Sequence, residues 1–344
     1  MRFLLILLSF VYRVIIGIRN FLFDWNIFKS KTYNVPIICV GNITSGGTGK
    51  TPHIEYLIHL LSDKKIAVLS RGYGRKTNGL FWVEFDSDPN NVGDESLQIK
   101  QKFPNINVVV SEKRRKGIEE ILIKFPGTEV VLMDDGYQHR WVKAGLNIIL
   151  NNHEHPIYSD QHLPLGTLRE SISSLNRSDI IITTKCPEIR DIEKKEISSK
   201  LNLFAHQKSF FSSISYQDCR SVFSNKSIEN LNNYNITLIT SIANIENLEK
   251  YLEEKGNVVR PFSFHDHHNY TTKDIQYILL QYKSSISDKN IILTTEKDKV
   301  KLTKFKEDFK GVEIYFVPIK MVIHNSREFN NEILKYVTTN KREC

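Results

Sequence analysis

The feature that most constrains the fold is a glycine-rich loop between a predicted buried strand and a predicted helix. The apolar run 36–40 predicts the strand, and the pattern from Thr51 to about residue 62 predicts the helix. Backbone N–H groups of such a loop point into one concavity, and the helix N-terminus adds its positive dipole, so the loop can hold a di- or triphosphate. The candidate nucleotide-binding residues are Thr44, Ser45, Gly46, Gly47, Thr48, Gly49, Lys50 and Thr51.

Two residues at the end of this loop have expected roles in binding ATP. Lys50 is expected to reach the β- and γ-phosphates, and the Thr51 hydroxyl to coordinate Mg²⁺. Loops of this kind usually have glycine at position 44, where this chain has Thr44, but Gly46 and Gly47 can supply the unusual backbone angles. An ordinary glycine-rich turn is the alternative. The position directly after a buried strand favours a nucleotide-binding core.

The remaining chain alternates short apolar runs with helical patterns. This alternation predicts an α/β fold, with a mainly parallel sheet like that of P-loop NTPases and helices on both faces. Further strands are expected at 66–69, 107–110, 129–133, 146–150 and 179–184, with helices at 94–103 and 112–125. The serine- and aromatic-rich segment 210–223 predicts paired antiparallel strands. A second alternation predicts strands at 235–241, 258–264, 291–295 and 313–317 and helices at 247–254, 272–282 and 328–337.

These patterns divide the chain into four parts. Residues 1–30 are expected to form a hydrophobic helix, 31–206 the nucleotide-binding core, 207–234 a β-strand linker, and 235–344 a smaller α/β domain. The lysine-rich stretch 299–310 is expected to be the solvated face of a helix.

Composition and charge limit the classes of partner. Apolar residues make up 40% and charged residues 25%, as in ordinary globular proteins. The net charge of +8 favours anionic partners, although many cytosolic proteins are mildly basic. No recognition motif or aromatic–basic array indicates nucleic acid. The four separated cysteines, Cys39, Cys186, Cys219 and Cys344, predict reduced thiols rather than a zinc site or disulfides.

The first 28 residues are the most hydrophobic part of the chain. The polar positions Arg2, Ser9, Arg13, Asn20 and Asp24 fall on one narrow stripe of a helix, while Arg19 lies outside it. A mostly apolar helix with a thin basic stripe suits the interfacial plane of an anionic membrane. A helix buried against its own domain and a membrane-spanning helix are the alternatives; the apolar run of about ten residues is short for a span.

Acidic side chains follow or begin predicted elements near the loop. Asp134 and Asp135 follow the strand 129–133, where a carboxylate can orient Mg²⁺ or its waters, although a surface Asp after a strand is common. Asp94 opens a helix, either as its N-cap or as the base that accepts a proton from an attacking hydroxyl.

Further polar residues are candidates for binding substrate or phosphate. They are Arg71, Tyr73, Arg75, Arg114, Gln138, His139, Arg169 and Glu170. For Arg114 and Arg169, a solvated surface position is the alternative. The cluster of His265, Asp266, His267 and His268 suggests acid–base support or substrate binding more than a metal site.

The chain resembles the tetraacyldisaccharide 4'-kinases of lipid A biosynthesis in Gram-negative bacteria. The resemblance covers nearly the whole chain as seven motifs in order. They are V-G-N-I-T-S-G-G-T-G-K-T-P at 40–52, S-R-G-Y-G-R at 70–75, G-D-E at 93–95, D-D-G-Y-Q-H at 134–139, L-P-L-G-T-L-R-E at 163–170, D-H-H at 266–268 and T-E-K-D at 295–298. The chain departs from the family pattern at Ser96, where Pro is common, and at Lys299, where a small residue is usual.

The resemblance implies transfer of the ATP γ-phosphate to the 4'-hydroxyl of an acylated glucosamine disaccharide 1-phosphate. It assigns Asp94 as the catalytic base, assisted by His267, with His268 left as the alternative. Asp134 and Asp135 then orient Mg²⁺ and phosphate, and Arg169 and Glu170 fall in a segment tied to the active site. No role follows for residues 296–298.

The resemblance also implies a peripheral enzyme on the cytoplasmic face of the inner membrane, because an acylated substrate stays in the bilayer. No obligate protein partner is expected. The main alternative is a membrane-associated P-loop ATPase or GTPase switch. Against GTP, Thr184-Lys185 lacks the Asp of a guanine-binding element, and the intact Lys50 and Thr51 argue against a degenerate, purely lipid-binding module.

Overall fold

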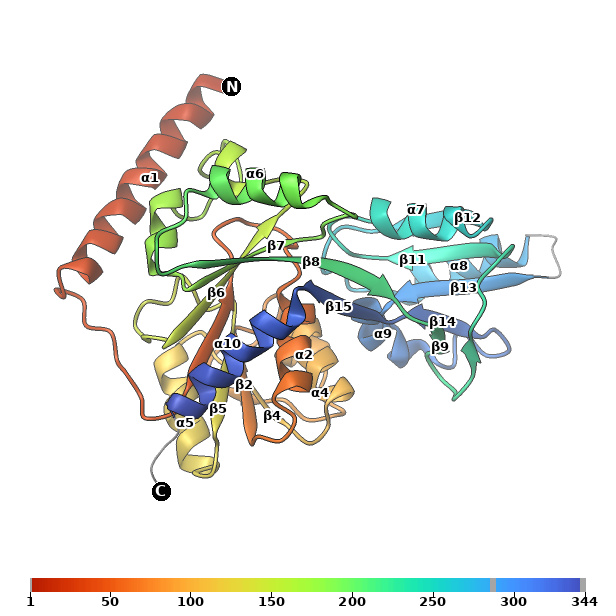
Figure 1. Ribbon diagram of the computed structural model, residues 1–344. Helices are drawn as coiled ribbons and strands as arrows, with labels where there is room; N and C mark the ends of the chain where they lie inside the picture. The colour runs from red at the N-terminus through yellow and green to blue at the C-terminus, as the bar shows by residue number, and fades with distance from the viewer. Residues whose placement is uncertain (1, 285–288, 341–344) are drawn as a thin grey trace.

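The computed structural model describes residues 2–284 and 289–340, and these form two sheets joined by two chain connections (Figure 1). Met1 and Cys344, with which the first and last expected parts begin and end, lie outside the described residues. Cys39, Cys186 and Cys219 are buried free thiols, as the sequence predicts.

Among the described residues, the larger sheet has nine strands in the order β15-β8-β7-β6-β1-β5-β2-β4-β3. Their bounds are β1 Ile37–Gly41, β2 Ile66–Ser70, β3 Phe81–Trp82, β4 Asn107–Val110, β5 Val130–Asp134, β6 Leu146–Asn152, β7 Ile180–Thr184, β8 Lys208–Tyr216 and β15 Ile319–His324. The seven strands from β8 to β4 are parallel, and β15 and β3 pair antiparallel at the two edges. The runs of Ile, Val and Leu in the central strands are buried on both faces, which suits a parallel sheet.

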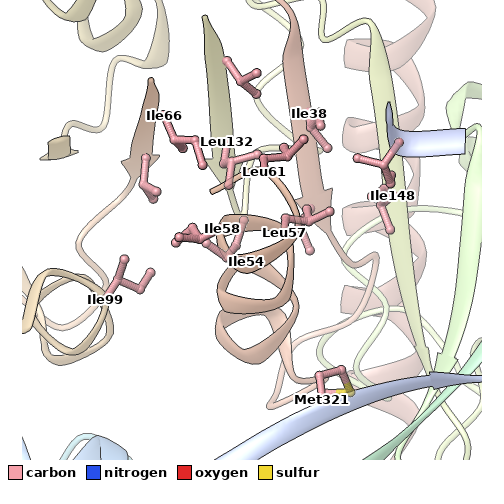
Figure 2. Packing of buried hydrophobic residues seen from close by; sticks show 14 of the residues in the cluster. Ile38, Ile54, Leu57, Ile58, Leu61, Ile66, Ile99, Leu132, Ile148 and Met321 are labelled. Carbon is pink, nitrogen blue, oxygen red and sulfur yellow. The ribbon is translucent and has the colours of Figure 1, made fainter. Parts of the chain in front are cut away.

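Helices cover both faces of this sheet. Those of the larger domain are α2 Lys50–Leu60, α3 Pro89–Val92, α4 Asp94–Lys102, α5 Arg114–Lys124, α6 Asp191–Leu201 and α10 Ser326–Thr339, with short 3₁₀ turns at Ile157–Ser159 and Ile172–Arg177. On one face, Ile54 and Leu57 of α2 pack against Ile38 and Leu132 of the sheet (Figure 2). This packing fixes the first turn of α2 at the end of β1.

The smaller sheet has the order β10-β9-β14-β13-β11-β12 over the described residues. Its elements are β9 Cys219–Ser221, β10 Ser227–Ile228, β11 Asn235–Thr240, α7 Glu246–Glu254, β12 Val258–Ser263, α8 Thr272–Lys283, β13 Asn290–Thr295, α9 Glu296–Leu302, a 3₁₀ turn Thr303–Phe305 and β14 Ile314–Val317. Strands β11 to β14 are parallel, as the second alternation of the sequence predicts.

The assignment of chain segments to the two sheets differs from the four expected parts. In the expected linker 207–234, β8 joins the larger sheet while β9 and β10 join the smaller one, so the prediction of one antiparallel pair at 210–223 is wrong. In the expected C-terminal domain 235–344, β15 pairs with β8 and α10 packs on the larger sheet. Alternation of side chains identifies a strand but does not identify its partner, which explains both differences.

The lysine-rich stretch 299–310 is less exposed than expected. Lys301 is only 3% exposed, and Phe305 and Phe309 are buried in the core of the smaller sheet. Helix α9 also ends at Leu302, so the interpretation as one solvated helix face is wrong.

Helix α1 (Arg2–Asp24) leans against the larger domain at one edge of the molecule (Figure 1). Ser9 and Tyr12 face the protein, because the Ser9 hydroxyl donates to the His162 carbonyl (2.9 Å) and the Tyr12 hydroxyl to the Arg169 carbonyl (3.1 Å). Arg2 and Arg13 of the expected stripe are exposed. Arg19, outside the expected stripe, donates to the Gln138 carbonyl. The apolar side is exposed, so burial within the domain does not describe this helix; by length and composition alone it is long enough to cross a membrane.

Candidate active site

The candidate residues converge at the carboxyl edge of the larger sheet. β1 lies between β5 and β6, and β5 lies beside β2, so the loops after β1, β2 and β5 are neighbours. These loops contain the glycine-rich segment, Arg71 and Asp135. In an open parallel sheet, this edge is where ligands bind.

The glycine-rich loop is held open by a second segment of the chain. The Ser45 N–H donates to the Thr167 carbonyl (2.8 Å), and the Arg169 N–H donates to the Ile43 carbonyl (2.7 Å). Gly49 has a φ of 88° and directly precedes α2, a conformation that favours glycine. The loop 44–51 and the segment 163–170 therefore form one wall of the site.

The Asn42 side chain is a member of this wall that sequence reasoning missed. It is fully buried, donates to the Thr48 hydroxyl (2.9 Å) and accepts from Arg169. The position of Asn42 inside the G-N-I-T motif is the sequence feature that could have identified it as a site residue.

Lys50 and Arg169 both contact the Asp135 carboxylate. The Lys50 Nζ lies 3.8 Å from Asp135 Oδ1, and an Arg169 Nη2 lies 2.8 Å from the same oxygen. Burial alone would raise the pKa of Asp135, but these two cations hold it below its ordinary value. The three residues form a compact charged group beside the glycine-rich loop, so Arg169 is not a solvated surface residue.

Asp134 has the properties of a cation ligand. It is buried, its Oδ2 accepts from the Ser70 hydroxyl (3.2 Å), and its Oδ1 has no hydrogen-bond partner within residues 2–284 and 289–340. Burial, with Glu95 and Asp135 nearby, raises the pKa of Asp134, and a bound cation would relieve this cost. Among the described residues, no group of three or more His, Cys, Asp or Glu side chains could hold a metal ion.

Arg114 holds the backbone that carries Asp134 and Asp135. It is 2% exposed and donates to the backbone carbonyls of Asp134 (3.4 Å) and Asp135 (3.3 Å), so a solvated position is excluded. Burial and the charges of Arg114 and Arg71 lower the pKa of His139 to about 4. His139 is therefore neutral at physiological pH.

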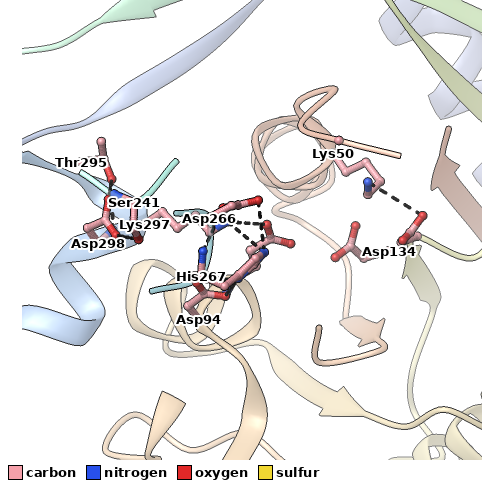
Figure 3. A network of polar contacts seen from close by, with 12 residues as sticks. Lys50, Asp94, Asp134, Ser241, Asp266, His267, Thr295, Lys297 and Asp298 are labelled. Carbon is pink, nitrogen blue, oxygen red and sulfur yellow. Dashed lines mark hydrogen bonds and ion pairs between the residues drawn. The ribbon is translucent and has the colours of Figure 1, made fainter. Parts of the chain in front are cut away.

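The Asp94 carboxylate and the His267 ring meet across the two domains. His267 Nδ1 lies 3.0 and 3.1 Å from the two Asp94 oxygens (Figure 3). Burial would raise the pKa of Asp94, but the hydrogen bond from His267 and the Lys297 charge lower it to about 2. His268 instead contacts Asp274 (3.1 Å), so the structure decides which histidine lies beside Asp94.

Gly93 fixes the backbone position of Asp94 at the start of α4. Its φ is 86°, and a Cβ at this position would lie 2.9 Å from the Tyr73 carbonyl oxygen, so a larger residue does not fit. The N-cap of α4 is Gly93, and the Asp94 side chain is free of that role. The N-cap alternative for Asp94 is therefore wrong.

The other sequence candidates divide between the site and its surroundings. Tyr73 is exposed and its ring lies 4.8 Å from that of His267, so it lies on the solvent-exposed side of the Asp94–His267 pair. Arg75 pairs with Glu112 and braces its own loop. Gln138 donates to the Asn42 carbonyl (2.9 Å), and Glu170 is fully buried against Arg177.

Comparison with known proteins gives a consistent result. Residues 1–338 match the family model for tetraacyldisaccharide-1-P 4'-kinase. A tetraacyldisaccharide 4'-kinase from Bacteroides fragilis is 42% identical, over 97% of this chain and 93% of its own length, and one from Flavobacterium johnsoniae is 39% identical over 96% of each. A crystal structure of the Aquifex aeolicus relative, described as the apo form in complex with ATP, superposes with a TM-score of 0.76 at 28% identity, covering 98% of this chain and 99% of that one.

The seven motifs noted in the sequence thus lie in a fold shared with an ATP complex, and the family match spans both domains. This chain belongs to the tetraacyldisaccharide 4'-kinase family.

Proposed function

We propose that this chain transfers the γ-phosphate of ATP to the 4'-hydroxyl of an acylated glucosamine disaccharide 1-phosphate, giving the 1,4'-bisphosphate. The observation that carries the proposal is the meeting of two groups at one sheet edge. One is the glycine-rich loop with Lys50, proposed to bind phosphate, and the other is the Asp94–His267 pair. An ATPase or GTPase switch would not need this pair, because it phosphorylates no hydroxyl. Family membership favours the kinase over an ATPase or GTPase switch.

Residues 44–51 are proposed to bind the ATP phosphates, with Lys50 at the β- and γ-phosphates. Lys50 would exchange its contact with Asp135 for the γ-phosphate, and Arg169 would keep Asp135 ionised and in place. Mg²⁺, when bound, would neutralise phosphate charge, held by the Thr51 hydroxyl and by the Asp134 and Asp135 carboxylates directly or through water. The unpartnered Oδ1 of Asp134, among the described residues, supports this assignment.

Asp94 is proposed to accept the proton of the 4'-hydroxyl. As the oxygen of this hydroxyl bonds to the γ-phosphorus, the bond from that phosphorus to the oxygen bridging to ADP breaks. Phosphoryl transfer has a loose transition state, in which the nucleophile loses its proton late. A carboxylate with a pKa of about 2 can therefore serve as orienting acceptor, because positioning matters more than basicity.

The remaining candidate residues are proposed either to contact ligands or to hold the loops of the site in place. Arg71, Tyr73, Gln138 and His139 would contact substrate or phosphate, while the buried Arg114 and Glu170 would hold the β5 loop and the 163–170 segment in place. Arg75 would act only as a brace for the loop that carries Tyr73, since its guanidinium pairs with Glu112.

The enzyme is further proposed to act as a peripheral protein at the cytoplasmic face of the inner membrane, on anionic lipid. Helix α1 presents a continuous exposed apolar side, which includes Phe3, Phe10 and Ile18. The same helix contacts Arg169 and Gln138 through its polar side. An acyl chain held at α1 would thus place the sugar head near the site.

One experiment tests the reaction. Purified protein is incubated with γ-labelled ATP and a panel of acylated glucosamine disaccharides, with and without the 1-phosphate, and labelled lipid is measured. Label is expected only on acylated acceptors with a free 4'-hydroxyl and only with Mg²⁺. ATP hydrolysis at the same rate without any lipid would contradict the proposal and favour the switch.

Two variants separate binding from transfer. Asp94→Ala should abolish lipid labelling while ATP still binds, and full activity would exclude Asp94 as the acceptor of the proton. Lys50→Ala should lose nucleotide-dependent turnover, and unchanged kinetics would refute the assignment of the loop.

A further inference from the structure

The T-E-K-D motif at 295–298 has no role in the site described so far, and its structure suggests one. Thr295 is the N-cap of α9, and its hydroxyl accepts from the Asp298 N–H (3.1 Å). The fully buried Asp298 carboxylate accepts from the Ser241 N–H (2.8 Å) and pairs with Lys301 (2.9 Å). The first turn of α9 is therefore fixed to the smaller sheet.

This anchoring aims Lys297 at the interface between the domains. Its Nζ lies 3.0 Å from Asp266 Oδ1, 3.3 Å from Glu95 Oε1 and 3.3 Å from His267 Nε2 (Figure 3). Burial would lower the pKa of Lys297, but the Glu95, Asp94 and Asp266 carboxylates raise it above its ordinary value. Lys297 is therefore an ammonium ion at physiological pH.

An ammonium ion has three hydrogen-bond donors and no acceptor. His267 Nε2 lies 3.3 Å from this ammonium ion, whereas Asp266 Oδ2 lies 3.6 Å from the same nitrogen, beyond hydrogen-bond distance. Nε2 therefore accepts from Lys297, and the ring proton lies on Nδ1. Nδ1 is the atom beside both Asp94 oxygens, so its N–H can donate to the carboxylate. In the other tautomer, a lone pair on Nδ1 would face the carboxylate and the pair would separate.

We infer that Lys297 is a positioning residue that selects the Nδ1–H tautomer of His267, so that His267 donates to Asp94. Asp94 is then held in place as an acceptor, with lone pairs left for the substrate hydroxyl. Lys297 and His267 come from the smaller domain, whereas Asp94 and Glu95 open α4 of the larger one. The ammonium therefore sets the tautomer and joins the two domains at the same point.

The tautomer is tested by NMR on the full-length protein with ¹⁵N-labelled histidine rings. Long-range ¹H–¹⁵N correlation at pH 8 distinguishes Nδ1–H, Nε2–H and the doubly protonated ring, and His267→Gln identifies the signal. We expect Nδ1–H in the wild type and in Lys297→Arg, and Nε2–H or a mixture in Lys297→Met. Lys299→Met is the matched control, since Lys299 lies two residues further along α9, on the opposite side of the helix, over the Phe316 ring.

The consequence for catalysis rests on the proposed role of Asp94 and is measured separately. We expect Lys297→Met to lower kcat about 10- to 100-fold with the KM for ATP little changed, by analogy with residues that orient metal-ligating histidines. Lys297→Arg should restore most of this loss, and Lys299→Met should resemble the wild type. Lys297→Gln serves as a second neutral variant if Lys297→Met fails to fold.

The possible failures are distinguishable. An Nε2–H or doubly protonated His267 in the wild type, or an unchanged Nδ1–H tautomer in both neutral variants, would overturn the inference. A changed tautomer with unchanged kcat would overturn the positioning role, and the proposed role of Asp94 would then be decided by Asp94→Ala alone.

Discussion

A single buried carboxyl group, Glu55, shows how one residue couples the packing of three helices to pH. Glu55 lies on α2, and Lys102 on α4 contacts both Glu55 and Glu296 of α9 at 2.8 Å. Gln98 also donates to Glu55 (2.8 Å). Two carboxylates thus share one ammonium ion between the domains, and burial, opposed by Lys102, raises the pKa of Glu55 from 4.5 to about 7.

This raised pKa makes stability depend on pH in a defined direction. A carboxyl that is harder to ionise in the folded state destabilises that state as the pH rises from about 4.5 to about 7. Glu55→Gln should remove this contribution, so that Tm falls less between pH 5 and pH 8 than in the wild type. Thermal unfolding across this range is the measurement, with the exposed Glu253→Gln as control. Parallel wild-type and Glu55→Gln profiles would contradict the assigned pKa.

At the scale of an element, α1 reverses the arrangement expected of a surface helix. Ser9 and Tyr12 bond to the protein, while Phe3 is 80% and Phe10 63% exposed. Exposed aromatic and aliphatic side chains on one continuous helix indicate a surface that is covered by another apolar medium. The position of the helix beside the 163–170 segment makes a bilayer the expected medium, because the proposed substrate is a lipid.

Substitution on the exposed side of α1 tests this expectation. The double variant Phe10→Ser with Ile18→Ser should bind vesicles containing anionic lipid at least tenfold more weakly, since each side chain contributes roughly 1.5–3 kcal/mol when buried. Co-sedimentation with vesicles measures the effect. Ile123→Ser, at a still more exposed position on α5, is the matched control and should leave binding unchanged. Equal loss in the control would mean that α1 is not the membrane surface.

At the scale of the whole molecule, the chain crosses between the sheets twice and ends on the sheet where it began. β8 and β15 pair along the connection, and α10 then buries Phe329 among residues of the larger core. The Phe329 ring contacts Tyr56 of α2 and Phe210 of β8. The C-terminal helix therefore stabilises the domain that carries the phosphate loop.

Because α10 packs on the larger domain, a substitution in this C-terminal helix should destabilise that domain. Phe329→Ala should cost about 3–5 kcal/mol, because the site is buried and cannot collapse fully. Thermal unfolding should therefore give a lower Tm than that of the wild type. Leu334→Ala, on the exposed side of the same helix, is expected to change Tm little. If both variants behave alike, α10 does not belong to the core.

Local chemistry made much of the fold and site predictable. The strands and helices follow from hydrophobic period. The positions of the loop 44–51 and of Asp134 directly after buried strands place them at one sheet edge, whereas the proposed role of Asp94 came from the family resemblance. Arg75 and Arg114 were less predictable, since whether an arginine is buried or solvated depends on which carbonyls and carboxylates lie opposite it. These partners come from distant parts of the chain.

The sequence by itself determined the class of fold and the family. The fold class follows from the alternation of strand and helix patterns along the chain, and the family from seven short motifs in a fixed order. Only the tertiary structure decided that β15 and α10 return to the larger sheet, that His267 rather than His268 lies beside Asp94, and that Lys297 faces the ring. Strand partners and contacts across domains depend on packing between segments far apart in the chain, and no local pattern specifies them.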